Sequence, residues 1–225
     1  MNIRQMIYPV ALLVSTAALL AAAPARAESA PARGDSGFGI GINVSNLGFG
    51  VEARQVLSPS FDLRFGIAGI AYHTDFDYDD INYDIKQSTA VPEVKLDWRP
   101  MQGMFRLTFA LAYYNQVSNL ELTPEPGGSY NIGNGSYTSA QIGTLTGKVS
   151  HHVGAPYFGV GWDFLRNKNL GFTIDAGAYY RNDPDVWLSS TGTVSAADLA
   201  LEAQNIKDDT LTFVPVVKLG LLFRF

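Results

Sequence analysis

The sequence FVPVVKLGLLFRF closes the chain, from Phe213 to Phe225. Apolar side chains occupy every second position over most of this stretch, and Lys218 and Gly220 fall between them. Successive side chains of a β-strand point to opposite faces, so the pattern predicts a strand with one apolar face. A soluble β-sandwich would not expose so large an apolar face on its terminal strand. The stretch therefore predicts a strand that faces lipid.

The same period-two alternation recurs through most of the chain. It predicts strands at 38–44, 47–53, 61–75, a segment that ends at Trp98, 105–113, 143–164, 170–178 and 213–225. The fold class expected is all-β, an eight-stranded antiparallel transmembrane β-barrel. Pro156 lies inside one predicted strand and predicts a β-bulge there.

The connections alternate in length, as they do in outer-membrane barrels with short periplasmic turns and long external loops. Segment 123–139 is rich in Gly, Pro, Ser and Asn, and we expect it to form an external loop without a core. In segment 182–209, Ser195 to Asp198 is typical of a helix start, which leaves either a short helix or an irregular loop. The turns expected are short at 57–60, 99–103 and 166–169, and longer at 75–82, 123–139 and 182–209.

The N-terminus predicts an export signal. Arg4 precedes an apolar run from Ile7 to Ala23, and Ala25-Arg26-Ala27 matches a signal-peptidase site. A transmembrane helix is the alternative, but the run is short and contains Pro9. The predicted organisation is a signal peptide at 1–27, a periplasmic leader at 28–36 and a barrel at 37–225.

Charge and composition exclude several functions. Removing residues 1–27 takes away two arginines and no acid, so the net charge of −5 becomes −7. No basic block remains to neutralise phosphates, which argues against nucleic acid as a partner. The chain has no cysteine for a thiolate or disulfide. Asp75 to Asp80 lacks the glycine and distal glutamate of a calcium loop, so we expect solvated loop acids, no metal and no cofactor.

The C-terminal residues Lys218, Gly220, Phe223 and Phe225 resemble the assembly signal of outer-membrane barrels. The resemblance implies recognition by the barrel-assembly machinery, location in the outer membrane, and contact with its lipids and lipopolysaccharide. Residues 37–225 as a whole look like the small OmpA-, OmpX- and OmpW-type barrels and the porin-family outer-membrane proteins. The resemblance leaves the oligomeric state open.

The inward faces of the predicted strands carry a charge network. An eight-stranded barrel is just wide enough to be filled by side chains, so its buried charges must pair with one another. Such pairing predicts a closed lumen and a structural or surface-interaction role. The network comprises six acids and six bases, Glu52, Arg54, Asp62, Arg64, Glu93, Lys95, Asp97, Arg106, Asp163, Asp175, Lys218 and Arg224.

Two alternative functions remain open from the sequence. The OmpW-type resemblance implies a narrow conduit for small apolar molecules, which would need a continuous apolar pocket in the outer half of the barrel. A lipid A-modifying enzyme would need a Ser/His/Asp set, for which the candidates are Ser150, His151 and His152 with Asp79, Asp80 or Asp185. The local signatures of such enzymes are missing, so we expect no catalytic activity. The alternation predicts that small residues line the outer half of the lumen, namely Gly66, Ala68, Ala110, Ala112, Gly159 and Gly177.

Overall fold

The computed structural model describes residues 37–78, 81–124, 126–164 and 169–225. The predicted signal peptide (1–27) and leader (28–36) lie outside the described residues, as do Asp79, Asp80 and most of the turn predicted at 166–169.

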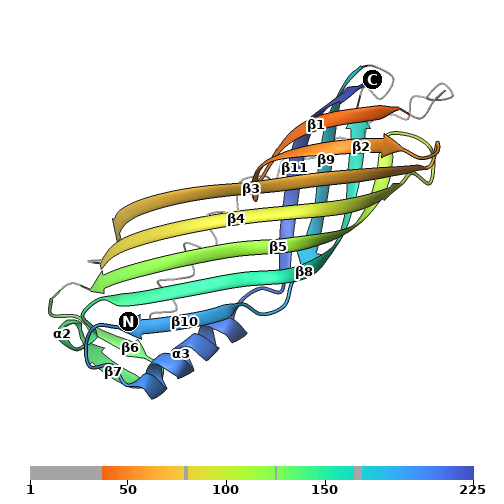
Figure 1. Ribbon diagram of the computed structural model, residues 1–225. Helices are drawn as coiled ribbons and strands as arrows, with labels where there is room; N and C mark the ends of the chain where they lie inside the picture. The colour runs from red at the N-terminus through yellow and green to blue at the C-terminus, as the bar shows by residue number, and fades with distance from the viewer. Residues whose placement is uncertain (1–36, 79–80, 125, 165–168) are drawn as a thin grey trace.

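Eight antiparallel strands close into a barrel, which confirms the predicted fold class (Figure 1). Each strand pairs with its neighbour along the chain, and the last strand pairs with the first to complete the ring. Closure leaves the barrel without a free sheet edge in the membrane. The barrel strands are β1 (Phe38–Ser45), β2 (Gly48–Val56), β3 (Phe61–Tyr78), β4 (Ile81–Trp98), β5 (Phe105–Pro124), β8 (Leu145–Phe164), β9 (Leu170–Tyr180) and β11 (Phe213–Arg224).

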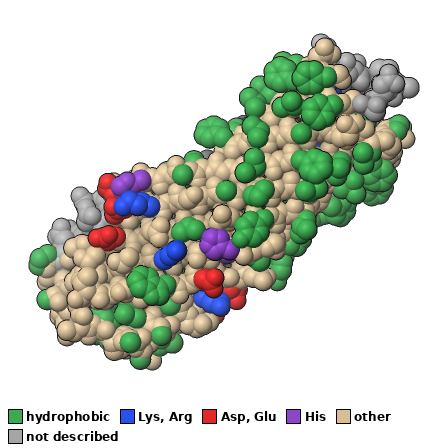
Figure 2. Space-filling view, viewed as in Figure 1, with side chains coloured by type: hydrophobic (Ala, Val, Ile, Leu, Met, Phe, Trp, Pro, Cys, Tyr) green, Lys and Arg blue, Asp and Glu red, His purple; other side chains and the backbone are tan. Residues whose placement is uncertain are grey.

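An apolar belt surrounds the barrel. Ile42, Val51, Phe65, Leu111 and Phe158 are exposed on its outer face, whereas the residues between outward positions are mostly buried. Figure 2 shows hydrophobic side chains gathered over the barrel end of the molecule. This pattern, apolar outside and polar inside, is the reverse of a soluble protein and suits a hydrocarbon environment.

Four strands are far longer than a membrane requires. β3 and β4 have 18 residues each, and β5 and β8 have 20, whereas about 9–11 residues cross a bilayer. Their outer halves form a curved wall that extends well past β1, β2, β9 and β11 (Figure 1). The long loop predicted at 75–82 is therefore wrong, because the strand pairing continues to Tyr78 opposite Ile81.

The two long external segments are structured. Segment 123–139 contains the hairpin β6 (Ser129–Ile132) and β7 (Gly135–Thr138), and α2 (Ser139–Ile142) follows it. Segment 182–209 contains β10 (Asp185–Ser190), which pairs with the outer half of β8, and α3 (Ala196–Asp208). The helix alternative is thus confirmed, and the Asp198 N–H donates to the Ser195 cap. In the described part of the chain, no helix combines the length and apolar character needed to cross a bilayer.

We call β6, β7, α2, β10 and α3 the external platform. Tyr130 and Ile132 of the hairpin and Ile142 of α2 pack on Leu122 and Leu145 of the wall. The prediction that segment 123–139 forms no core is therefore wrong. The segment has few apolar residues of its own, but the wall beneath it supplies the rest of the buried surface.

Two local predictions need correction. The expected bulge at Pro156 is absent, because the β5–β8 pairing stays in register on both sides of it. The proline instead lies just beyond Tyr157, the last residue of β8 that pairs with β9, where a missing N–H costs no ladder bond on that side. Leu47 was expected to be the first residue of the strand at 47–53. It lies in the two-residue turn before Gly48 and is buried over the lumen, 8% exposed.

Candidate functional site

The centre of the charge network is a carboxylate shared by three guanidinium groups. Arg54 donates to Asp163 at 2.8 Å, and Arg99 and Arg106 donate to the same carboxylate. Arg106 also donates to Asp175 at 2.6 Å. All of these side chains are buried. Three cations on one carboxylate need further acids nearby, and these come from the neighbouring strands.

Arg64 links this centre to the acids of three other strands. Its guanidinium lies 2.6 Å from Asp97, 3.1 Å from Asp175 and 3.2 Å from Glu52. It also donates to the Thr108 hydroxyl at 3.2 Å. The result is one continuous network that ties β2, β3, β4, β5 and β9 together across the barrel.

Glu93 forms the outer end of the network. Lys95 lies 2.5 Å and Lys218 2.8 Å from one of its oxygens. The Tyr179 hydroxyl donates to its other oxygen. Lys218 therefore connects the last strand of the barrel to β4 on the far side of the lumen.

The structure buries eleven of the twelve predicted network residues together in the lumen. The exception is Arg224, which is half-buried at the end of β11, where its guanidinium covers Gly171. Arg99 also belongs to the network, although residues 99–103 were expected to form a turn. Its side chain is buried and joins Asp62 to Asp163. Extending the inward alternation one step beyond Asp97 would have found it.

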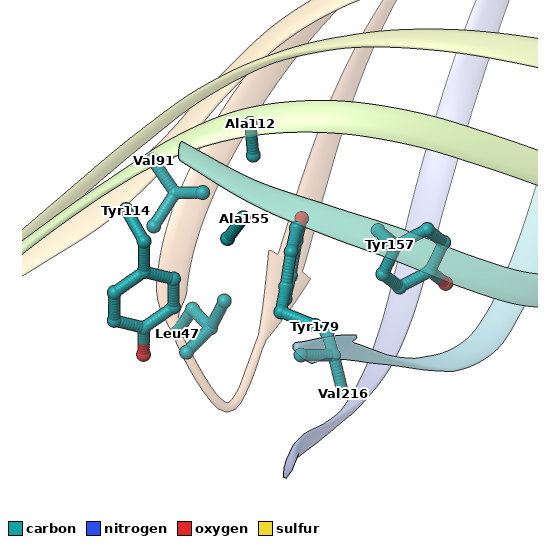
Figure 3. Close-up of a cluster of buried hydrophobic side chains, with 8 residues drawn as sticks. All are labelled: Leu47, Val91, Ala112, Tyr114, Ala155, Tyr157, Tyr179 and Val216. Atoms are coloured by element: carbon teal, nitrogen blue, oxygen red, sulfur yellow. The ribbon is translucent and has the colours of Figure 1, made fainter. Parts of the chain in front are cut away.

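A layer of tyrosines covers the network on the external side. The tyrosine layer consists of Tyr114, Tyr157 and Tyr179, and Figure 3 shows these rings with Leu47 and Val91 around them. The ring centroids of Tyr157 and Tyr179 are 4.8 Å apart, and those of Tyr114 and Tyr179 are 5.9 Å apart.

The tyrosine layer explains the small residues of the outer lumen. A Cβ at Gly159 would lie 2.3 Å from the Tyr157 hydroxyl, and one at Gly177 would lie 2.5 Å from it. These glycines make room for the Tyr157 ring. Ala68 and Ala112 are likewise buried. The Tyr157 ring thus occupies the space beside these two glycines.

Those candidate catalytic residues that the structure describes do not form a Ser/His/Asp constellation. Ser150 and His152 lie on the outer face of β8, and His151 points to the inner face, because neighbouring strand residues alternate. Asp185 of β10 pairs opposite Ser150. Among the described residues, no side-chain hydrogen bond joins Ser150 to either histidine or to Asp185. Asp79 and Asp80 lie outside the described residues.

Three potential metal ligands meet on the outer face of the wall. His73 Nε2 lies 3.2 Å from Asp75 Oδ1 and 3.1 Å from Asp84 Oδ1. Lys86 Nζ lies 3.4 Å from the other Asp84 oxygen and already supplies a positive charge. Asp75 was expected to be a loop acid, but it belongs to β3.

The external platform is held together by acids of α3 that bind the turn of the hairpin. Glu202 accepts from the Gly133 N–H at 3.0 Å, and Asp198 accepts from the Asn134 N–H at 3.1 Å. The Tyr137 hydroxyl donates to Asp198 at 2.5 Å. α3 also lies alongside β10, where it covers the edge of the sheet (Figure 1).

The four residues of the predicted assembly signal lie on both faces of β11 and just beyond its end. Lys218 and Gly220 are buried on the lumen side, and Phe223 is exposed to lipid. Phe225 is 81% exposed, and its backbone N–H donates to Phe38 O at 2.9 Å. The terminal residue therefore extends the seam at which the barrel closes.

Comparison with solved structures identifies the same architecture. CarO of Acinetobacter baumannii has a TM-score of 0.63 and 24% identity, and the match covers 83% of this chain and 97% of that protein. CarO2 of the same organism has a TM-score of 0.66 and 22% identity, covering 84% and 99%. Neither a protein-family model nor a curated protein sequence matches the chain. The chain thus has the fold of an eight-stranded transmembrane β-barrel, in agreement with its apolar belt and closed sheet.

Proposed function

We propose that this protein is a closed barrel that acts at the cell surface through its external wall and platform, rather than as a pore. The observation that carries the proposal is the filled lumen. The charge network crosses the barrel from wall to wall, and the tyrosine layer covers it on the external side. A solute could pass only if both were displaced.

The length of the wall supports a surface role. Ten or so residues of β5 and of β8 extend beyond the span that a membrane needs, about 30 Å of strand. These residues carry a second hydrophobic core, a hairpin and a capped helix. A barrel that served only to anchor itself would not need an ordered structure of this size outside the bilayer.

Insertion into the outer membrane needs two kinds of partner, the membrane lipids and the barrel-assembly machinery. The lipid face of the barrel contacts outer-membrane lipids and lipopolysaccharide, and the residues Lys218, Gly220, Phe223 and Phe225 serve the barrel-assembly machinery. The proposal includes no catalytic activity. A lipid A acylation change that depends on His151 and His152 would contradict that part of the proposal.

Conductance in planar bilayers tests the closed lumen. We expect the purified protein to show no steps of porin size, because the paired charges leave no continuous water path. A Tyr157→Ala, Tyr179→Ala double variant removes two rings of the tyrosine layer and should raise the ion leak. Tyr113→Ala is the matched control, since Tyr113 is exposed on the outer face. Porin-like conductance of the unmodified protein would overturn the proposal.

A further inference from the structure

A polar band crosses the inner face of the wall between its two apolar clusters. Thr89, Gln116 and His151 lie directly opposite one another on β4, β5 and β8. The next row outward carries Gln87 and Ser118. The tyrosine layer lies on the lumen side of this band, and the core of the external platform lies on its external side. A row of polar side chains between two apolar clusters is suited to hold a polar ligand.

Arg181 reaches this band from the connection between β9 and β10. Its Nη1 donates to Gln116 Oε1 at 2.8 Å, and its Nε donates to Leu211 O at 3.4 Å. The guanidinium carbon lies 5.1 Å from the centre of the Tyr114 ring. These contacts orient the guanidinium fork but bring it no negative charge.

The charge of Arg181 is uncompensated in the described part of the chain, where no carboxylate lies within ion-pair distance of it. This separates it from the lumen cations, such as Arg64, which is surrounded by three acids. Arg181 lies outside the barrel strands, and burial lowers the pKa of its guanidinium. A partly buried cation without a counter-charge is stabilised when an anion binds.

His151 supplies a second observation at the same place. Its side chain is 4% exposed, and its Nδ1 lies 3.5 Å from Arg181 Nη1. Its Nε2 is buried and has no hydrogen-bond partner among the described residues. Buried polar groups are nearly always paired, so an unpaired ring nitrogen on a histidine that contacts a cation without a counter-charge points to a ligand.

We propose that the polar band is a binding site for the oxyanion group, carboxylate or phosphate, of a small solute. Arg181 supplies the charge and the planar fork that matches such groups, and Gln116 and the Tyr114 ring hold that fork in place. His151 Nε2 provides a further hydrogen bond. The site rests on the proposed surface role, because it lies on the external side of the tyrosine layer that covers the lumen network.

Side-chain NMR of the full chain in detergent micelles tests the site. The Arg181 Nε–Hε signal, assigned by its loss in Arg181→Lys, is followed during titration with acetate, with inorganic phosphate, and with chloride at equal ionic strength. We expect a saturable shift with acetate or phosphate and none with chloride. Arg181→Gln, followed by the His151 signals, should weaken binding at least about tenfold, because a charge-assisted hydrogen bond is lost.

The matched control is Lys148→Gln. Lys148 is exposed on the opposite face of β8, so its loss removes the same charge but should leave binding unchanged. If Arg181→Gln fails to assemble, Gln116→Leu keeps the charge and removes the orienting acceptor, and it should also weaken binding. A carboxylate solute is indicated if only acetate binds, and a phosphorylated solute if phosphate binds more tightly.

Equal, unsaturable shifts with all three anions, or unchanged binding in both variants, would overturn the site. Either result is independent of the conductance of the barrel. A barrel that conducts ions could still bind acetate, and a closed barrel could fail to bind it.

Discussion

Replacing Asp163 with asparagine removes the carboxylate at the centre of the charge network and keeps the shape of the side chain. Three guanidinium groups, from Arg54, Arg99 and Arg106, then face a neutral amide. Breaking a buried ion pair by removing one partner costs about 3–5 kcal/mol. Arg106 keeps Asp175 at 2.6 Å, so part of its charge stays compensated. We therefore expect a loss of about 4 kcal/mol in the free energy of unfolding.

Urea unfolding in phospholipid vesicles, followed by tryptophan fluorescence, measures this loss. Trp162 is next to Asp163 in β8 and reports on the barrel wall. The matched control is Asp185→Asn, which removes an exposed carboxylate from β10. That control should change stability by no more than about 0.5 kcal/mol. The slope of the unfolding curve should be the same for both variants, since both unfold the same surface.

The reasoning fails if Asp163→Asn costs less than about 1 kcal/mol, the range of a surface ion pair. That result would mean that water reaches the lumen and screens its charges. It would also remove the main support for a closed barrel. A large loss in Asp185→Asn as well would show that the assay responds to charge in general.

Three further predictions concern the ends of the structure. Deleting Phe225 removes its hydrogen bond to Phe38 at the closing seam, so the yield of heat-modifiable barrel in the membrane fraction should fall. The control is Phe61→Leu, which alters an exposed ring elsewhere and should give a higher yield than the deletion. Ser195→Ala removes the cap of α3 and should destabilise that helix by about 1 kcal/mol, measured by hydrogen exchange of its amides while the barrel amides stay unchanged. Hydrogen bonds from Tyr137 and Ser195 lower the pKa of Asp198. The ionised Asp198 carboxylate therefore stabilises the platform fully above its ordinary pKa of about 3.9, and this stabilisation is lost as the pH falls through the lowered pKa. Exchange in the hairpin β6–β7 should therefore speed up below about pH 4, and Asp198→Asn should abolish that dependence; equal acid sensitivity in the variant would contradict it.

The strand-level features could be predicted because each depends on neighbouring residues alone. Alternation places Phe223 outward and Lys218 inward without any knowledge of the partner strands. The same rule collected eleven lumen charges from seven different strands. It failed at Arg99, where a turn was assumed, and at Leu47, where the turn lies one residue later than predicted and directs the side chain over the lumen.

The external features could not be predicted, because they depend on surfaces that are far apart in the sequence. Segment 123–139 has too few apolar residues for a core and acquires one only by packing on β5 and β8. The tyrosine layer depends in the same way on glycines of other strands that make room for Tyr157. The local sequence pattern around segment 123–139 or around Tyr157 does not indicate which distant residues will pack against it.

The sequence by itself determined the barrel, its strand faces and the balance of charge inside it, because a two-residue period separates lipid-facing from lumen-facing positions along each strand. Only the tertiary structure decided which acid meets which base, what fills the outer lumen, and where Arg181 is left beside His151 without a counter-charge. Those features depend on the register and closure of the sheet, which bring together residues more than a hundred positions apart, such as Lys218 and Glu93.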